Sequence, residues 1–120
     1  MTARSSDVSK KAMPYALMVK VAERFQTLSD ANRLRLLQLL IEGDSSVNAL
    51  AQSAELSVAN ASKHLAILRN AGFIDRRKEG TRAIYTLASE TPRILCDVLC
   101  KEMLAQAERD VAVAAGLEQP

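Results

Sequence analysis

A mainly helical domain with a single β-hairpin is the fold class that the sequence predicts. Apolar residues recur at helical spacing in separate stretches along the 120-residue chain. One pair of short, β-type runs stands among them, on either side of a turn that contains Gly80. Aromatic residues make up only 3% of the chain and Trp is absent, so leucine, alanine, isoleucine and valine must build the core. A chain of this length forms one domain with one modest core.

The expected elements follow one another in the order α-α-α-α-β-β-α. Pro14, acceptable at the first helical position, opens a helix that ends near Leu28. Ser29-Asp30 caps a helix over Ala31–Glu42, whose inner face is Leu34, Leu37 and Ile41, and Ser45-Ser46 caps a helix over Val47–Ala54. Ser57 caps a fourth helix that Gly72 ends. Strands over Ile74–Arg77 and Ala83–Leu87 follow around a turn of residues 78–82, and Thr91 caps a long last helix. This is the order of a winged helix-turn-helix domain, here over residues 13–115, with residues 1–12 as a flexible N-terminal arm.

The fourth predicted helix combines a buried stripe with a face suited to DNA. Ala61, Leu65 and Leu68 recur at helical spacing and form the stripe. The side chains on the opposite face are short or cationic, and such a face fits the major groove. The alternative is an ordinary surface helix that binds no DNA. DNA contacts, to bases or to phosphates, are therefore predicted for Ser57, Val58, Asn60, Ser62 and Lys63.

Positive charge is concentrated on this helix and on the hairpin. The whole chain carries a formal +2, but residues 56–87 hold six cations and two acidic residues, a net +4, which leaves −2 elsewhere. The cationic side chains of the hairpin either keep an exposed turn hydrated or contact DNA. Because they directly follow a helix suited to the major groove, we predict DNA contacts from Arg77, Lys78 and Arg82. Alternation along the strand places Arg77 on the face opposite Lys78. His64 is expected as a neutral ring at the margin of the groove, with phosphate donation or packing as alternatives and a role as metal ligand the least favoured, since the chain has no second histidine.

Three segments resemble the ArsR family of small dimeric bacterial repressors. They are LSDANRLRLL at 28–37, SKHLAILRNAG at 62–72 and EGTRAIY at 79–85. The likeness covers roughly residues 14–110. It implies a homodimer that forms through the first and last helices and releases double-stranded operator DNA when a signal is sensed.

The metal-binding motifs of that family are missing, and two cysteines stand elsewhere. The start of the third helix, 46–51, has no thiol, imidazole or carboxylate, and the last helix has no histidine. Zinc sites take about four N, S or O ligands, so neither family arrangement can form, and we expect no zinc, cadmium or nickel site of these kinds and no cofactor. Cys96 and Cys100 lie four residues apart, on one helix face. They either pack as small hydrophobes or form a sensor that is oxidised or binds arsenite or a soft metal such as Cu(I).

The last helix also predicts how the chain assembles. It has more apolar positions than one core can cover, which predicts a homodimer.

The sequence lacks a Gly-rich phosphate loop and a paired nucleophile and base, so we do not expect an enzyme. It also lacks an apolar run near the ~18 residues that span a bilayer and a secretory signal, which predicts a cytoplasmic protein without a membrane partner. A winged-helix module that binds protein is the alternative, but its groove face would be more apolar than the +4 region.

Overall fold

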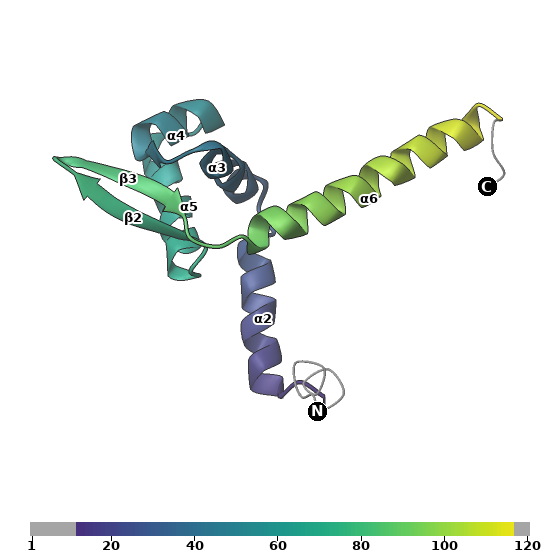
Figure 1. The fold of residues 1–120 in the computed structure, drawn as a ribbon, viewed down its shortest axis with the longest axis horizontal. Helices are drawn as coiled ribbons and strands as arrows, with labels where there is room; N and C mark the ends of the chain where they lie inside the picture. The colour runs from purple at the N-terminus through teal and green to yellow at the C-terminus, as the bar shows by residue number, and fades with distance from the viewer. Residues whose placement is uncertain (1–11, 117–120) are drawn as a thin grey trace.

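The computed structural model describes residues 12–116, so the predicted flexible arm 1–12 lies almost wholly outside the described residues. Its elements, in chain order, are α2 (Tyr15–Thr27), α3 (Ala31–Glu42), β1 (Ser45–Ser46), α4 (Val47–Ala54), α5 (Val58–Asn70), β2 (Ile74–Glu79), β3 (Arg82–Leu87) and α6 (Thr91–Ala114). Helices α3, α4 and α5 gather beside the β2–β3 hairpin, while α2 and α6 project from this body in different directions (Figure 1).

The predicted order of helices and strands is confirmed, with one addition and one change in the hairpin. Strand β1 lies where the sequence predicts only a helix cap, and it pairs with β3 to complete an antiparallel sheet in the order β1-β3-β2. The predicted five-residue turn is wrong, because Glu79 pairs with Arg82 and only two residues remain in the loop. Gly80 adopts a φ of +65° there, a conformation that glycine tolerates best and that a two-residue loop requires. We call this hairpin, residues 74–87, the wing.

Side-chain caps fix the starts of three helices. Asp30, Ser46 and Ser57 each accept a hydrogen bond from a backbone N–H three residues on, at the starts of α3, α4 and α5. The predicted cap at Thr91 is wrong: α6 already includes Thr91, and its backbone N–H donates to the Ser89 hydroxyl at 3.1 Å. Pro92 nevertheless lies in the first turn of α6, where a missing N–H costs nothing.

The core lies where α3, α4, α5 and the sheet meet. Leu36, Leu65 and Leu68 are fully buried there, and Tyr85 of β3 packs against the same cluster. The expected inner face of α3 was Leu34, Leu37 and Ile41, but the buried residues are Leu36, Leu37 and Leu40. The buried face of α3 is rotated about the helix axis from the predicted one, because α3 contacts α4, α5, β3 and α6 rather than a single neighbour.

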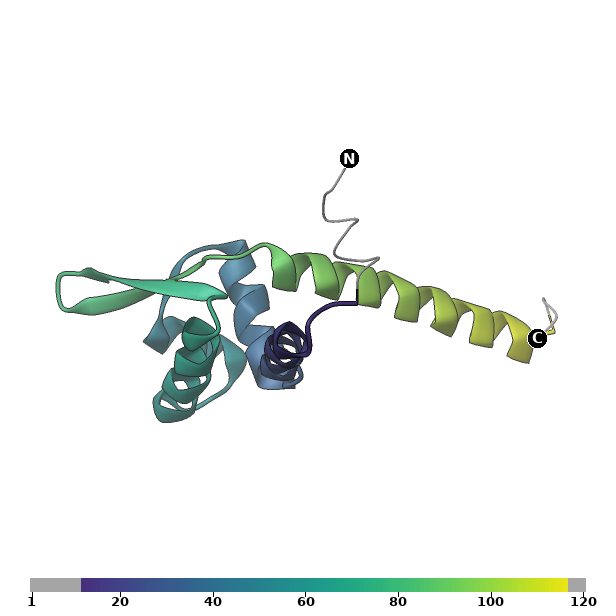
Figure 2. The ribbon, with the colours of Figure 1, turned by 90° about the horizontal axis from the view of Figure 1, so that it is seen from below.

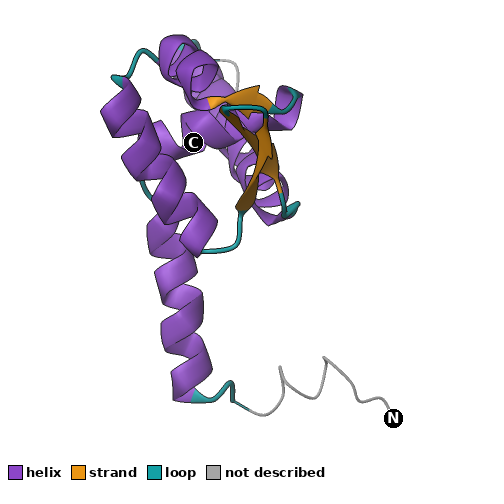
Figure 3. Ribbon diagram, turned by 90° about the vertical axis from the view of Figure 1, so that its left-hand side faces the viewer, coloured by secondary structure: helices purple, strands orange, loops and turns teal. Residues whose placement is uncertain are grey.

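Helices α2 and α6 leave broad apolar faces open. No residue of α2 is buried, and in α6 only Pro92 is. Figure 2 shows α6 extending well beyond the body that holds the sheet, and in Figure 3 α2 extends below that body. The exposed large apolar side chains are Tyr15, Leu17, Met18, Val19, Val21 and Phe25 of α2 and Ile94, Val98, Leu99, Met103, Leu104 and Val111 of α6. Large exposed apolar patches on soluble proteins mark interaction sites. No helix among residues 12–116 is long and apolar enough to cross a bilayer.

Candidate DNA-binding surface

Helix α5 has the two faces that its sequence predicts. Ala61, Leu65 and Leu68 are completely buried against the core. On the other side, Val58 is 47% exposed, and the side chains at Asn60, Ser62 and Lys63 are exposed as well. Because α4 packs across α5 on its buried side, the open face is free to enter a groove.

Ser57 begins this helix through its own hydrogen bond. Its hydroxyl oxygen accepts from the backbone N–H of Asn60 at 3.1 Å. The cap satisfies one of the unpaired N–H groups of the first turn. Ser57 therefore sets where α5 starts, in addition to standing at the edge of its open face.

His64 points toward the neighbouring helix. Its side chain is half-buried, and its Nδ1 lies 3.4 Å from a guanidinium nitrogen of Arg33 in α3. Arg33 also donates from Nε to the Thr27 carbonyl oxygen at 2.6 Å and lies 3.9 Å from the Asp30 carboxylate. The backbone N–H of Arg33 is the main reason that the pKa of Asp30 lies below its usual value. Sequence reasoning missed this junction of α2, α3 and α5, because only the fold brings these residues together.

The wing divides its cations between two faces. Pairing of Arg77 with Ile84 and of Lys78 with Ala83 puts Arg77 and Lys78 on opposite sides. Arg77 bonds to two carboxylates, Asp44 at 2.9 Å and Glu79 at 2.9 Å. Lys78 and Arg82 are exposed and form no ion pair with any residue in 12–116. The wing therefore offers at least two cations that are not engaged within the described chain.

A second contact that sequence reasoning missed joins α2 to the end of α5. The Arg24 side chain donates from Nε to the Ala71 carbonyl oxygen at 2.8 Å. Ala71 is the C-cap of α5, and Gly72 follows at φ +86°, as its predicted place after the helix requires. No local sequence pattern could reveal a bond between residues 47 positions apart.

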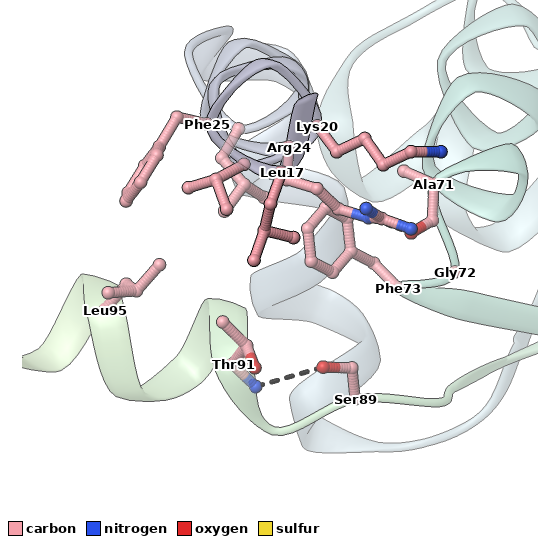
Figure 4. Close-up of a pocket in the computed structure, with 12 residues that line it drawn as sticks. Leu17, Lys20, Arg24, Phe25, Ala71, Gly72, Phe73, Ser89, Thr91 and Leu95 are labelled. Atoms are coloured by element: carbon pink, nitrogen blue, oxygen red, sulfur yellow. Dashed lines mark hydrogen bonds between the residues drawn. The ribbon is translucent and has the colours of Figure 1, made fainter. Parts of the chain in front are cut away.

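An open cavity of about 500 Å³ adjoins this contact. Figure 4 shows Leu17 and Phe25 of α2 facing Leu95 of α6, with Arg24 and Phe73 on the remaining side. The lining is mostly apolar and belongs to the same open faces of α2 and α6. This cavity is therefore part of the exposed apolar surface between the two helices.

The two cysteines lie between α6 and α3. Both line a second cavity of about 350 Å³ together with Leu34, Leu37 and Ile41 of α3. Cys96 is half-buried, Cys100 is exposed, and both thiols are free. Burial raises the pKa of Cys96, and the neighbouring Cys100 adds to the effect. Within the described part of the chain, no three His, Cys, Asp or Glu side chains gather closely enough to hold a metal ion.

Comparison with known proteins gives consistent matches. A family model described as "Bacterial regulatory protein, arsR family" matches residues 30–76. The chain is 38% identical over 103 residues to the HTH-type transcriptional regulator Rv0324 of Mycobacterium tuberculosis, covering 83% of this chain and 44% of that protein. It is 37% identical over 97 residues to the uncharacterized HTH-type regulator Rv0081 of the same species, covering 80% of this chain and 85% of that one. The chain thus spans less than half the length of Rv0324.

The chain is also similar to a solved domain structure and to a cadmium resistance regulator. The homodimeric winged helix-turn-helix domain of Mb0332 from Mycobacterium bovis superposes with a TM-score of 0.69 at 34% identity, covering 77% of this chain and 88% of that domain. A cadmium resistance regulatory protein CadC homolog of Staphylococcus aureus is 36% identical over 101 residues, covering 83% of this chain and 81% of that protein. The predicted winged helix-turn-helix fold and the predicted family are confirmed. The chain belongs to the ArsR family of bacterial regulatory proteins.

Proposed function

We propose that this transcriptional regulator acts as a homodimeric repressor, with α5 in the major groove of double-stranded operator DNA. One observation carries the proposal. Helix α5 is fully buried along one stripe, and its opposite face is exposed and carries short side chains and the cationic Lys63. That face admits the helix to a groove about 12 Å wide. The proposal places the protein in the cytoplasm, where bacterial DNA lies.

The proposed contacts differ in kind along the surface. Asn60 and Lys63 have the donors and acceptors that read base edges, and Val58 offers apolar contact for a thymine methyl group. Ser57 and Ser62 suit phosphate oxygens or bases. Lys78 and Arg82 of the wing suit phosphates, because they are cationic and exposed. Arg77 and His64 would have to leave the partners that hold them before either reached DNA.

The apolar faces of α2 and α6 support the homodimer. A second copy of this chain would cover the exposed side chains of both helices and fill the cavity between them. Twofold symmetry would then present two copies of α5 to one side of the duplex. The expected operator is an imperfect inverted repeat with half-site centres about one helical turn, or a multiple of it, apart.

Selection from a pool of random-sequence duplexes tests this function directly. The enriched duplexes should share an inverted repeat and should bind more tightly than unselected duplex. The logarithm of the binding constant should fall with the logarithm of salt by about 0.9 per phosphate contacted. Lack of retention on any duplex at low salt would reject DNA binding and favour the alternative of a protein-binding winged helix.

Thiol sensing at Cys96 and Cys100 is a second candidate, for the signal rather than for DNA binding. Its support is the shared placement of both thiols on the cavity between α6 and α3, since α3 in turn packs on α5. The donor set does not suit zinc, which takes about four ligands, whereas thiolates are the soft donors that suit arsenite or Cu(I). The raised pKa of Cys96 favours the packing alternative.

The double variant Cys96→Ser, Cys100→Ser tests this second candidate. With arsenite or Cu(I) as probe, wild-type protein should release the selected duplex while the variant stays bound, because a ligand shifts an equilibrium only through differential affinity. Equal responses of the two proteins would return both cysteines to packing.

A further inference from the structure

We propose that Asp44, Arg77 and Glu79 form a latch that positions the wing for DNA, so that Arg77 acts inside the protein rather than on a phosphate. We call these three residues the wing latch. The inference rests on the proposed DNA-binding function, and it assigns a positioning role to a loop residue, Asp44, that lies outside both α5 and the wing.

The wing latch spans the whole width of the sheet. Asp44 immediately precedes β1, which pairs with β3, and Arg77 lies on β2, the far strand. The Arg77 side chain therefore crosses the central strand to place Nη1 2.9 Å from Asp44 Oδ2. Its Nη2 and Nε donate to Glu79 Oε2 at 2.9 and 3.1 Å. One guanidinium thus joins the near edge of the sheet to the outer part of the wing.

The charges of the wing latch are matched to one another. A hydrogen bond from Thr86 of β3, followed by one from Arg77, lowers the pKa of Asp44 below its usual value. The two carboxylates raise the pKa of Arg77 in turn, Asp44 most strongly. The two carboxylates thereby compensate the charge of Arg77 within the protein, and three of its five N–H donors bond to them.

The wing needs such a contact because little else supports its outer half. Strand β1 pairs with β3 only at Tyr85 and Ile84, so the hairpin beyond that point has two strands. An isolated two-stranded hairpin is marginally stable in water, and every β2 residue after Ile74 is exposed. The three groups are themselves 44–56% exposed, so the latch adds little to global stability. Its effect is on the direction in which the wing points.

Four single variants and one double variant test the wing latch. Asp44→Asn and Arg77→Gln each break it, Arg77→Lys keeps the charge but cannot bond to both carboxylates in the same way, and the double variant combines the first two. Asp75→Asn is the matched control, since Asp75 lies on the same face of β2 and forms no ion pair within residues 12–116.

Amide hydrogen exchange in the free protein is the first measurement. Exchange at residues 79–82 should quicken in Asp44→Asn and Arg77→Gln and should not change in Asp75→Asn. Binding to the selected duplex is the second: each latch variant should lose roughly three- to tenfold in affinity, and the double variant should lose no more than either single one. The salt slope should stay as in the wild type, and Arg77→Lys should not restore affinity.

Two results would overturn the wing latch. Unchanged hairpin exchange in Asp44→Asn and Arg77→Gln would show that the contacts do not hold the wing. A salt slope reduced by about 0.9 in Arg77→Gln, together with tighter binding in Asp44→Asn and rescue by Arg77→Lys, would show that Arg77 contacts a phosphate. If the wild-type protein bound no duplex, the proposed function would fail, and the exchange data alone would decide whether the latch orders the wing.

Discussion

Arg24 of α2 donates a hydrogen bond of 2.8 Å to the carbonyl oxygen of Ala71, the C-cap of α5. The last carbonyls of a helix have no partner within it, so an arginine from another helix supplies one here. This single bond connects the helix proposed for dimerisation with the end of the helix proposed to read DNA. A shift of α2 against the partner copy would therefore move the end of α5 or break this hydrogen bond.

Replacing Arg24 with Ala should weaken operator binding more than it weakens the fold. The bond is exposed, and a net contribution of about 1 kcal/mol to the free energy of unfolding is the usual scale. Operator affinity and denaturant midpoint should be measured together. Lys20→Ala is the control, because Lys20 lines the same cavity one turn earlier and donates no hydrogen bond to α5 within the described residues. Equal effects of the two variants would remove Arg24 from any coupling role.

Ser57→Ala should destabilise the protein through the start of α5. Loss of a serine cap typically costs about 1 kcal/mol, because the Asn60 N–H loses its acceptor. Chemical denaturation gives the free energy of unfolding. Ser62→Ala should leave stability nearly unchanged, since Ser62 is exposed on the same helix and caps nothing. A neutral Ser57→Ala would contradict the capping assignment.

Recognition-helix variants and wing variants should differ in how they weaken binding. Asn60→Ala or Lys63→Ala should cost roughly 1–3 kcal/mol on the selected duplex if the residue contacts a base, with little loss on random duplex. Lys78→Ala or Arg82→Ala should weaken both duplexes and lower the salt slope by about 0.9 for each lost phosphate contact. Titrations at several salt concentrations separate the two patterns. An Arg82→Ala protein with unchanged affinity and slope would count against the wing's part in binding.

A charge placed on the open face of α6 should separate the two copies. Leu99 is 57% exposed and Leu104 is 66% exposed, so Leu99→Asp or Leu104→Asp should leave each chain folded while burying a charge in the dimer. Sedimentation at micromolar concentration should give twice the 13.1 kDa chain mass for the wild type and a single chain mass for the variants. A wild-type protein that sediments only as one chain would refute the homodimer.

The two thiols should react at different rates. The pKa of Cys96 is raised, so its neutral thiol persists to higher pH than that of an ordinary cysteine, and its thiolate is scarce near pH 8. Cys100 is exposed and should be alkylated first. Mass spectrometry of iodoacetamide adducts over a pH series should show Cys96 lagging, with its rate rising as the pH approaches and passes the raised pKa. Faster labelling of Cys96 would reverse this assignment.

The sequence by itself determined the features that depend on near neighbours along the chain. Asp30, Ser46 and Ser57 cap helices because a side-chain oxygen three residues before an N–H is a local arrangement. The buried stripe of α5 followed from helical periodicity, and Gly72 from its tolerance of positive φ. The order of elements and the family resemblance came from the same local patterns. The residues proposed to contact DNA stay predictions.

Only the tertiary structure decided which side chains meet across the chain. Arg77 and Asp44 are 33 residues apart, Arg33 and His64 are 31 apart, and Arg24 and Ala71 are 47 apart. Periodicity says which face of an element is buried or open, but it does not say which element arrives there or which polar group it offers. Strand β1 was missed for that reason, because two serines become a strand only when β3 lies beside them. Hydrogen-bond partners between elements are fixed by packing, and packing is a property of the whole fold.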